Sequence, residues 1–562
     1  LAAWKASQPT NFFEADTDLK RGLRRHYGKE RYEAIAPMLS AAGAGAAAIE
    51  PLVAEIEHRA SLPRLERYDG IGRRTESVVY DHRYDDVGKQ LYGCGSVSVL
   101  AEPGTMSQAL VLGYINNQLG EAGHNCPIAC TLGLVRALQE AGGDELKDRY
   151  LPGLLNPDYA ERLDGAQFMT EVQGGSDVGA NAVVARPMDD GTGRWTIHGE
   201  KWFCSNASAA LFLMTARPIS AGKGTGGLGL FLVPRTIDGE TNHFTIRRLK
   251  EKLGTRAMAS GEMDFDGCIA YPVGPVESGF KTMMNNVINT SRIANASGVL
   301  GMSRRALTIG ASYAEFRRAF GAPIARFPLV QHTVADMKSE HAAMLAGHLH
   351  LAALRDRMDG DQATEEELGF WRVALNLNKY RTSVSASEVI RSALELLGGN
   401  GAIESFSAIP RMLRDNIVYE NWEGTHNTLA MQVLRDMSRL GVGAPFLSNL
   451  QSRAQALVDG SAAVFVPKIQ HVLTELGAAL RGLADVDPGL QSLRMRPLAD
   501  RMAFIMSAVA FAEQAAWETP EYGDTRAMKL LSWFWRRRLN APLDLPNASD
   551  LDALSAISEI SV

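Results

Sequence analysis

The chain has 562 residues, of which 46% are hydrophobic and 22% are charged, and its formal net charge is −6. A chain of this length is too long for one compact core, so we expect three or four domains of ordinary globular composition. The acidic balance argues against a protein coated in basic charge for nucleic acid, and no uninterrupted apolar run spans a bilayer of roughly 30 Å.

The predicted elements change character along the chain. Residues 1–165 show apolar side chains at helical spacing and predict a helical N-terminal domain, which a charged, glycine-containing loop or short hairpin interrupts at 64–78. Residues 166–275 are short β-rich runs between turn residues, which predict a small antiparallel barrel or sandwich. Helical patterns return over 276–442, as a bundle, and over 443–562, as an extension. This order, in which helices are followed by strands and then by helices again, favours an α+β multidomain protein over alternating βαβ units.

The five cysteines form no C-x-x-C pair, and no Cys/His cluster has the spacing of a zinc site, so we expect no metal. Cys126 and Cys130 lie one helical turn apart and are interpreted as small buried side chains. The first residues lack the basic-then-apolar order of a signal peptide. Few cysteines and no leader favour a reducing, cytoplasmic setting.

Two motifs surround the start of the β region. Residues 168–181 combine Thr170 and Ser176 with a Gly-Gly turn, whose backbone N–H groups can approach an anionic or carbonyl-rich ligand. A plain glycine turn is the alternative. Residues 198–209 place Trp202, Phe203 and Ser205 on one strand, as an aromatic wall for a flat heterocycle or simply as core.

Two further motifs could contact a diphosphate. Residues 316–324 put two arginines beside a Gly-Pro break, which can grip phosphates or form a solvated basic turn. Residues 394–402 end a helix with Gly398 and Gly399, which can pack against phosphate or cap the helix.

Glu423 is the candidate for chemistry in the fifth motif, 411–437. It lies between a tryptophan and Gly-Thr, at the entry to a helix that begins near residues 425–428. Partial desolvation there raises the pKa of a carboxylate toward that of a useful base, and the helix N-terminus attracts anions. A helix-capping acid is the alternative.

The order TE-x-x-GGSD, K-W-F-x-S-N, R-x-x-FG, LGGNG and RD-x(7)-EGT, over about residues 90–440, resembles the acyl-CoA dehydrogenases. The resemblance implies a helical N-terminal domain, a middle antiparallel β domain and a four-helix bundle, here followed by an extra helical domain. It implies FAD as cofactor, an acyl-CoA substrate, an electron acceptor such as an electron-transfer flavoprotein, and a homotetramer.

The resemblance also implies roles for individual residues. Glu423 matches the base that removes the α-proton while flavin N5 accepts the β-hydrogen as hydride, and Arg317 and Phe320 match residues that reach the FAD of a neighbouring subunit. The residues matched to FAD contacts are Met169, Thr170, Ser176, Phe203, Ser205, Arg317, Phe320, Gln331, Glu395, Gly398, Gly399, Thr425 and Asn427. Those matched to substrate contacts are Ser176, Arg292, Trp422 and Gly424.

Finer details resemble the long subgroup that contains the bacterial alkylation-response protein AidB. They include RYDGIGRR at 67–74, CPIACT at 126–131 and the extra C-terminal helices. This leaves two alternatives open: a DNA-associated protective protein, or an acyl-CoA binder without turnover. DNA binding is disfavoured because residues 445–562 carry 11 basic and 13 acidic side chains, and phosphate contacts need clustered cations. The basic-aromatic segment 533–538 is interpreted mainly as an amphipathic helix docked on the bundle.

Overall fold

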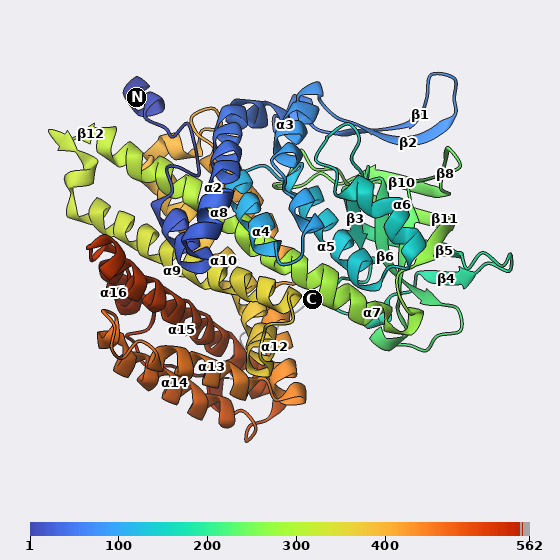
Figure 1. The fold of residues 1–562 in the computed structure, drawn as a ribbon. Helices are drawn as coiled ribbons and strands as arrows, with labels where there is room; N and C mark the ends of the chain where they lie inside the picture. Colours follow the sequence, from blue (N-terminus) through green and yellow to red (C-terminus); the bar gives the residue numbers. More distant parts are fainter. Residues whose placement is uncertain (551–552, 555–562) are drawn as a thin grey trace.

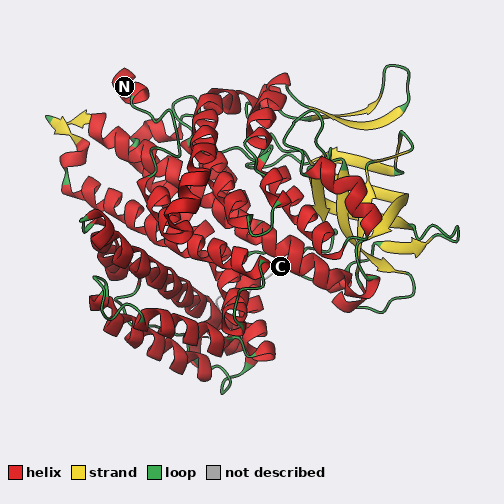
Figure 2. Ribbon diagram, viewed as in Figure 1, coloured by secondary structure: helices red, strands yellow, loops and turns green. Residues whose placement is uncertain are grey.

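The computed structural model describes residues 1–550 and 553–554. All strands except the β12–β13 hairpin at residues 318–323 gather at one end of the molecule, long helices run away from them, and the C-terminal helices pack along the side of those long helices (Figures 1 and 2). The chain is therefore an α+β protein with a β region between two helical regions and with extra helices at its C-terminal end, as predicted.

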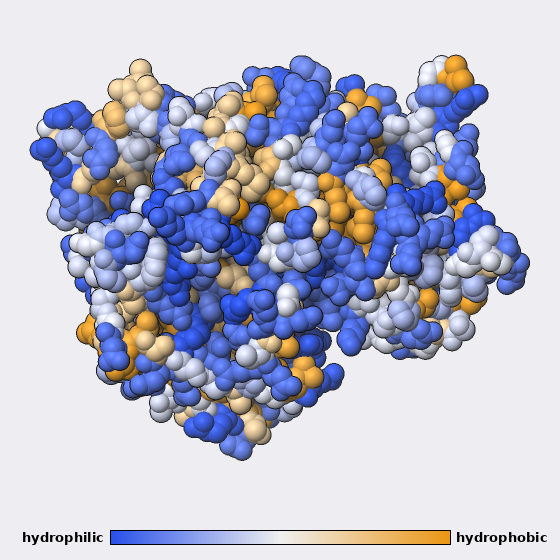
Figure 3. Space-filling view, in the orientation of Figure 1, coloured by the Kyte–Doolittle hydropathy of each residue, from blue (hydrophilic) through white to orange (hydrophobic). Residues whose placement is uncertain are grey.

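The N-terminal region is helical with one hairpin. Its longest helix, α2, bends at Gly28, which adopts a φ of 72°. The segment predicted as a loop or hairpin is an antiparallel hairpin, whose tip projects beyond the β domain and carries a small apolar area (Figure 3). The elements are α1 (Ala2–Ala6), α2 (Thr17–Ile56), β1 (Arg64–Tyr68), β2 (Arg74–Val79), α3 (His82–Gly93), α4 (Met106–Asn117), α5 (Asn125–Ala141) and α6 (Asp144–Leu154).

The β domain is a small barrel. Pairing runs from β11 through β5, β4, β6 and β7 and returns to β11, so these strands form a closed ring around phenylalanine and methionine side chains. Most pairs are antiparallel as expected, but β3–β6 and β4–β6 are parallel. The main strands are β3 (Gly165–Phe168), β4 (Val184–Pro187), β5 (Trp195–Ser205), β6 (Leu211–Pro218), β7 (Gly229–Pro234), β10 (Phe244–Leu249) and β11 (Ser260–Pro272).

The bundle begins with a π-helical stretch, Met283–Ile288, that runs directly into α8. Helices α8 and α10 pack along much of their length, and α9 and α11 lie against them. A two-stranded hairpin at the far end of α8 connects to α9, at the opposite end from the β domain (Figure 1). The elements are α8 (Asn289–Phe316), β12 (Arg318–Ala319), β13 (Ala322–Pro323), α9 (Pro328–Asp359), α10 (Glu365–Leu396), α11 (Ile409–Asn421) and α12 (His426–Leu440).

The C-terminal extension docks through its last helix. Its elements are α13 (Gly443–Gln455), α14 (Val466–Arg481), α15 (Pro488–Tyr522) and α16 (Arg526–Arg538). Glu340 on α9 is fully buried and accepts hydrogen bonds from Arg537 at 3.1 Å and from Arg538 at 2.9 Å. Burial alone would raise the pKa of Glu340, but the surrounding guanidinium groups outweigh it and hold that pKa below its usual value. The basic segment 533–538 therefore serves docking, which favours the amphipathic-helix interpretation.

Helix α2 is relevant to the prediction that no uninterrupted apolar run of this chain spans a bilayer. Within the described residues it is the one helix whose length and composition would suit a membrane span, with a mean hydropathy of 1.3 over its most apolar 18-residue window. Core helices of globular proteins pass the same test, and Leu39, Ala42 and Val53 of α2 are fully buried against the rest of the fold. Isolated polar residues such as Ser40 and Glu50 interrupt the apolar part of α2, so it contains no long uninterrupted apolar run.

Candidate active site

Glu423 lies in the short connection between α11 and α12, and its backbone is in the left-handed region. Its φ is 58°, and the following Gly424 has a φ of 106°. A left-handed conformation costs a non-glycine residue roughly 1–2 kcal/mol, and such residues persist where the surroundings impose them. The connection is therefore held in a defined shape.

Two buried cations hold this connection through its carbonyl groups. Arg292 on α8 donates from Nε to the carbonyl oxygen of Glu423 at 3.1 Å. Lys379 on α10 donates from Nζ to the carbonyls of Glu420 at 2.8 Å and Gly424 at 3.0 Å. The resemblance placed Arg292 at the CoA end of the substrate. Arg292 is 4% exposed, and its other nitrogens bind the side chains of Asn376 and Gln432, while its contact with CoA stays a prediction.

The carboxylate of Glu423 faces the β domain. Gln167 on β3 donates from its amide nitrogen to Oε1 of Glu423 at 2.8 Å, and Ser291 on α8 holds the same amide. Burial raises the pKa of Glu423 to about 7, although Arg292, Lys379 and the Gln167 hydrogen bond each act to lower it. A carboxyl group with this pKa is divided between its two protonation states near neutral pH, which suits a general base.

Sulfur-containing and aromatic side chains lie around Glu423. Cys126 and Cys130 on α5 are buried as expected and form an apolar cluster with Met258, against which Trp422 packs. The ring of Tyr419 also packs against Trp422, with 4.5 Å between the two ring centroids. This apolar lining supplies the desolvation that raises the pKa of the carboxyl group.

The glycine loop of the β domain meets the start of α12. The hydroxyl of Ser176 lies 3.2 Å from that of Thr428, which lies 3.0 Å from that of Thr425. The structure thus brings together motifs that are 252 residues apart in the chain. Thr170 lies on the same loop, and its hydroxyl is close enough to Gly175 that a Cβ there would come within 2.7 Å of it.

The aromatic strand presents one ring to solvent. Phe203 is 55% exposed, and Trp202 is covered by the ammonium group of Lys250, 3.6 Å from its ring centroid. Ser205 is partly buried farther along β5. Met169, before the glycine loop, has its carbonyl bound by Asn181 and Lys201.

A second set of predicted residues lies at the other end of the bundle. Arg317 caps α8 directly before the β12–β13 hairpin, and Phe320 lies at the turn of that hairpin, where it is 96% exposed. Asn400, beside the exposed Gly398 and Gly399, bonds to Tyr313 just before the hairpin. The exposed Gln331 and Glu395 complete this set. Glu395 lies near the C-terminal end of α10, whereas Lys379, which binds the Glu423 connection, lies in the middle of that helix, so this set lies apart from Glu423 along α10.

Comparisons with known proteins assign this chain to a family. Family models match in chain order: the AidB N-terminal domain at residues 4–161, the acyl-CoA dehydrogenase middle domain at 166–268 and its C-terminal domain at 277–438. Acyl-CoA dehydrogenase family member 11 of Caenorhabditis elegans is 30% identical over 448 residues, which cover 76% of this chain and 71% of the relative. The chain belongs to the acyl-CoA dehydrogenase family.

Further relatives specify the subgroup and the fold. AidB of Escherichia coli is 31% identical over 389 residues, covering 67% of this chain and 69% of AidB, so the predicted resemblance to the AidB subgroup is confirmed. The structure of C. elegans ACDH-11 in complex with C11-CoA superposes with a TM-score of 0.87 at 25% identity, covering 98% and 95% of the two chains. An acyl-CoA dehydrogenase of Bacillus anthracis complexed with FAD has the same fold, with a TM-score of 0.67 at 20% identity, covering 84% and 86%.

Members of the acyl-CoA dehydrogenase family use FAD, and the residues present here fit that group. The first turn of α12 has no side-chain cap among the described residues, so its N–H groups are available to an anion. A Cβ built on Gly398 or Gly399 would meet open space, and Gly398 has a φ of 60°, so both glycines expose their backbone. The exposed ring of Phe203 and the hydroxyl of Thr170 supply a flat apolar surface and a donor.

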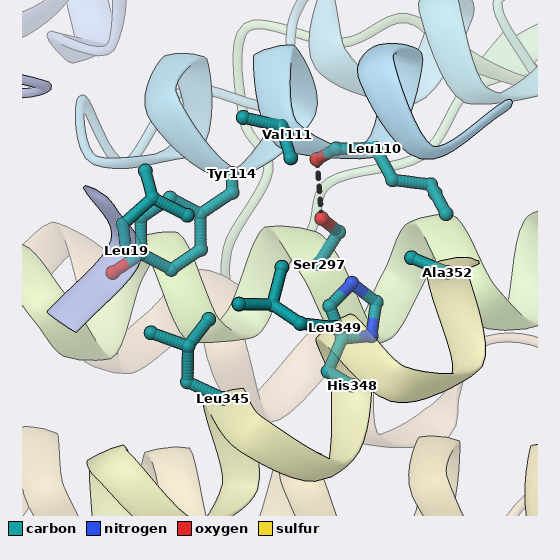
Figure 4. Close-up of a pocket in the computed structure, with 9 residues that line it drawn as sticks. All are labelled: Leu19, Leu110, Val111, Tyr114, Ser297, Leu345, His348, Leu349 and Ala352. Atoms are coloured by element: carbon teal, nitrogen blue, oxygen red, sulfur yellow. Dashed lines mark hydrogen bonds between the residues drawn. The ribbon is translucent and has the colours of Figure 1, made fainter. Parts of the chain in front are cut away.

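A gap inside the helical core is separate from this site. It lies between α2, α4, α8 and α9, has Leu19, Leu110, Leu345 and Leu349 in its lining, and is closed on one side by the Ser297–Leu110 hydrogen bond (Figure 4). The buried ring of His348 borders it, and burial lowers the pKa of that ring to about 3. The gap is too small to hold a water molecule, so it is a packing defect of the acyl-CoA dehydrogenase core.

Sequence reasoning missed Gln167, Ser291 and Lys379. Lys379 carried a weak signal, because Asn376, Asn378 and Lys379 are polar residues that follow one another closely at buried positions of α10. Buried polar side chains in a helix need internal partners, and those of Lys379 are the carbonyls of Glu420 and Gly424.

Proposed function

We propose that this protein catalyses FAD-dependent α,β-dehydrogenation of an acyl-CoA thioester, with Glu423 as the base. One observation carries the proposal: the carboxylate of Glu423 is held in a strained connection, aligned by Gln167 from another domain, and its pKa is raised to about 7. A helix-capping acid would not account for these features, because α12 has no side-chain cap among the described residues.

Glu423 takes the proton. The C–H bond at the α-carbon breaks, its electron pair forms the α,β double bond, and the proton passes to the carboxylate. Bound FAD supplies the acceptor for the hydride equivalent that leaves the β-carbon. Backbone N–H groups near the carboxylate hold the thioester oxygen and lower the pKa of the α-proton. Trp422 and the buried cysteines exclude water, which keeps the base desolvated.

The remaining site residues hold FAD and CoA in this proposal. Thr170, Phe203 and Ser205 contact the flavin ring, while Thr425 and Asn427 at the start of α12 contact the dinucleotide. Ser176, which bonds to α12, lies where the CoA moiety leaves the site. Trp422 and Gly424 flank the thioester next to the base. Arg317, Phe320, Gln331, Glu395, Gly398 and Gly399 serve the FAD of a neighbouring subunit in a homotetramer.

Relatives support the substrate class. ACDH-11 was solved with C11-CoA, and the chain matches that structure over nearly its whole length. We extend acyl-CoA binding to this chain, with a cytoplasmic setting and an electron acceptor such as an electron-transfer flavoprotein. Nucleic-acid binding is not favoured, since Arg537 and Arg538 are engaged with Glu340.

Anaerobic titration with acyl-CoAs tests the proposal. Saturated acyl-CoAs of increasing length and branching are added to the yellow protein, and loss of the oxidised flavin absorbance is followed. At least one class of chain should bleach the flavin within seconds, and the product should be the 2-enoyl-CoA. The matching enoyl-CoA is the control, because it is already oxidised and should bind without bleaching. If every chain binds and none bleaches the flavin, the protein is a binder without turnover.

A further inference from the structure

Lys379 is a buried cation that no part of the proposed chemistry uses. Its side chain is 0% exposed in the middle of α10, under the connection that carries Glu423. Among the described residues no carboxylate lies within ion-pair distance of its ammonium group; its hydrogen-bond acceptors are the carbonyls of Glu420 and Gly424. Removing an ammonium group from water costs several kcal/mol, so an unpaired lysine at this position calls for an explanation.

The two carbonyls lie on either side of the base. Glu420 is in the last turn of α11, where carbonyl groups lack helical partners and the helix dipole favours a cation. Gly424 directly follows Glu423. An ammonium group is a compact charge with three donors. Lys379 therefore ties Glu420 at the end of α11 to Gly424 before α12, and Glu423 lies between these two bonds.

Arg292 closes the same connection from α8. It binds the carbonyl of Glu423 itself, so two cations from two helices hold three carbonyls within five residues. A non-glycine residue stays at a φ of 58° only where its surroundings impose that conformation, and these bonds do so.

We propose that Lys379 is a positioning residue for the base: it holds the Glu423 connection so that the carboxylate points at Gln167 on β3, and its charge favours the ionised carboxylate. This inference rests on the proposed role of Glu423 and adds to it. Lys379 acts through the loop and through the electrostatic field at the carboxylate, without contact with the substrate.

The charges around Lys379 support this assignment. They are Arg292 on α8, Glu420 on α11, which pairs with His426 on α12, and Glu423 in the connection. Burial lowers the pKa of Lys379 to about 7, with Glu423 and Glu420 acting to raise it and Arg292 to lower it. Lys379 in turn acts to lower the pKa of Glu423, so a neutral side chain at position 379 leaves that pKa higher.

The test compares Lys379→Gln, a neutral donor, with Lys379→Arg, which keeps the charge, and with Lys338→Gln, an exposed control on α9. The pH profile of kcat/KM is measured for the FAD-loaded protein with an acyl-CoA that bleaches it. Lys379→Gln should lose roughly 100-fold in kcat/KM at neutral pH, the size of effect that a small misplacement produces. Its acid limb should move to higher pH, and Lys379→Arg should restore much of the position of that limb.

A purely structural role predicts a different result. Lys379→Gln would then lower the melting temperature and the amount of folded protein, while the acid limb per folded, flavin-loaded enzyme stayed at the wild-type pH; that outcome overturns the proposal. If Lys379→Gln does not fold, Lys379→Arg decides alone: an acid limb near the wild-type pH together with a lowered kcat/KM supports the positioning role, and an unchanged kcat/KM, or a limb that moves to higher pH although the charge is kept, opposes it. An active Glu423→Gln enzyme would instead overturn the base assignment, whatever Lys379 does.

Discussion

The amide nitrogen of Gln167 lies 2.8 Å from the carboxylate of Glu423, two residues that are 256 positions apart. One belongs to the β barrel and the other to the connection between two bundle helices. The orientation of the base therefore depends on how the β domain sits against the bundle, and Ser291 fixes the amide from the bundle side.

Gln167→Leu should weaken the enzyme and shift its pH dependence. The hydrogen bond acts to lower the pKa of Glu423, so its loss raises that pKa and moves the acid limb of kcat/KM to higher pH. One hydrogen bond to a charged group is worth about 1.5–3 kcal/mol, which corresponds to a loss of roughly 10- to 100-fold at neutral pH. Steady-state kinetics across pH measure both effects. An unchanged profile would mean that the bond does not persist when substrate is bound.

The wild-type rate should rise with pH through about 7. Glu423 accepts a proton only when ionised, and burial raises its pKa to about 7. Below that value the carboxyl group is mostly protonated and kcat/KM falls tenfold for each pH unit, while above it the rate levels off. A profile that is already flat at pH 5 would contradict the raised pKa.

Gly175→Ala should reduce FAD retention. An added Cβ would lie 2.7 Å from the hydroxyl of Thr170, so the glycine loop or that hydroxyl has to move. The ratio of flavin to protein after gel filtration measures the effect, with Gly222→Ala as the control because its Cβ would meet open space. Equal flavin content in the two variants would argue that this loop does not contact the cofactor.

Arg538→Ala should destabilise the docking of the C-terminal extension. Its removal leaves the buried Glu340 with fewer cations, and breaking a buried pair costs about 3 kcal/mol. The folded-state pKa of Glu340 is lowered, so the stabilisation is present above the usual value of 4.5 and is lost as pH falls through the folded-state pKa.

Urea unfolding near neutral pH and in acid checks this expectation for Arg538. The difference between wild type and Arg538→Ala should be large at pH 7 and shrink in acid. Arg536→Ala is the matched control, because Arg536 stacks on Trp533 without an ion pair among the described residues and should cost less than 1 kcal/mol. Equal losses in the two variants at pH 7 would contradict the role of Glu340.

Local sequence signals predicted the helical and β-rich regions and singled out Glu423 as the candidate base, while long-range contacts remained hidden. Glu423 was identifiable because the residues beside it define its motif, and the helical and β-rich textures follow from side-chain periodicity. Lys379 and Gln167 were not identifiable, since Lys379 binds two backbone carbonyls and Gln167 binds a carboxylate that only the fold brings near. The bond from Arg292 to the carbonyl of Glu423 was equally hidden, because a backbone carbonyl leaves no trace in a sequence. The parallel pairings β3–β6 and β4–β6 were not predicted either, because they depend on how the chain connects these strands in three dimensions.

Anaerobic mixing of Glu423→Gln with an acyl-CoA that bleaches the wild-type protein is the most direct test of Glu423 as the base. The amide matches the carboxylate in size but cannot take the α-proton, so the variant should keep its yellow colour and bind the acyl-CoA. We expect its flavin absorbance to stay unchanged over minutes, with a rate at least 1,000-fold below wild type, on the order of the contribution of a general base. Bleaching of Glu423→Gln at the wild-type rate would contradict the assignment of the base.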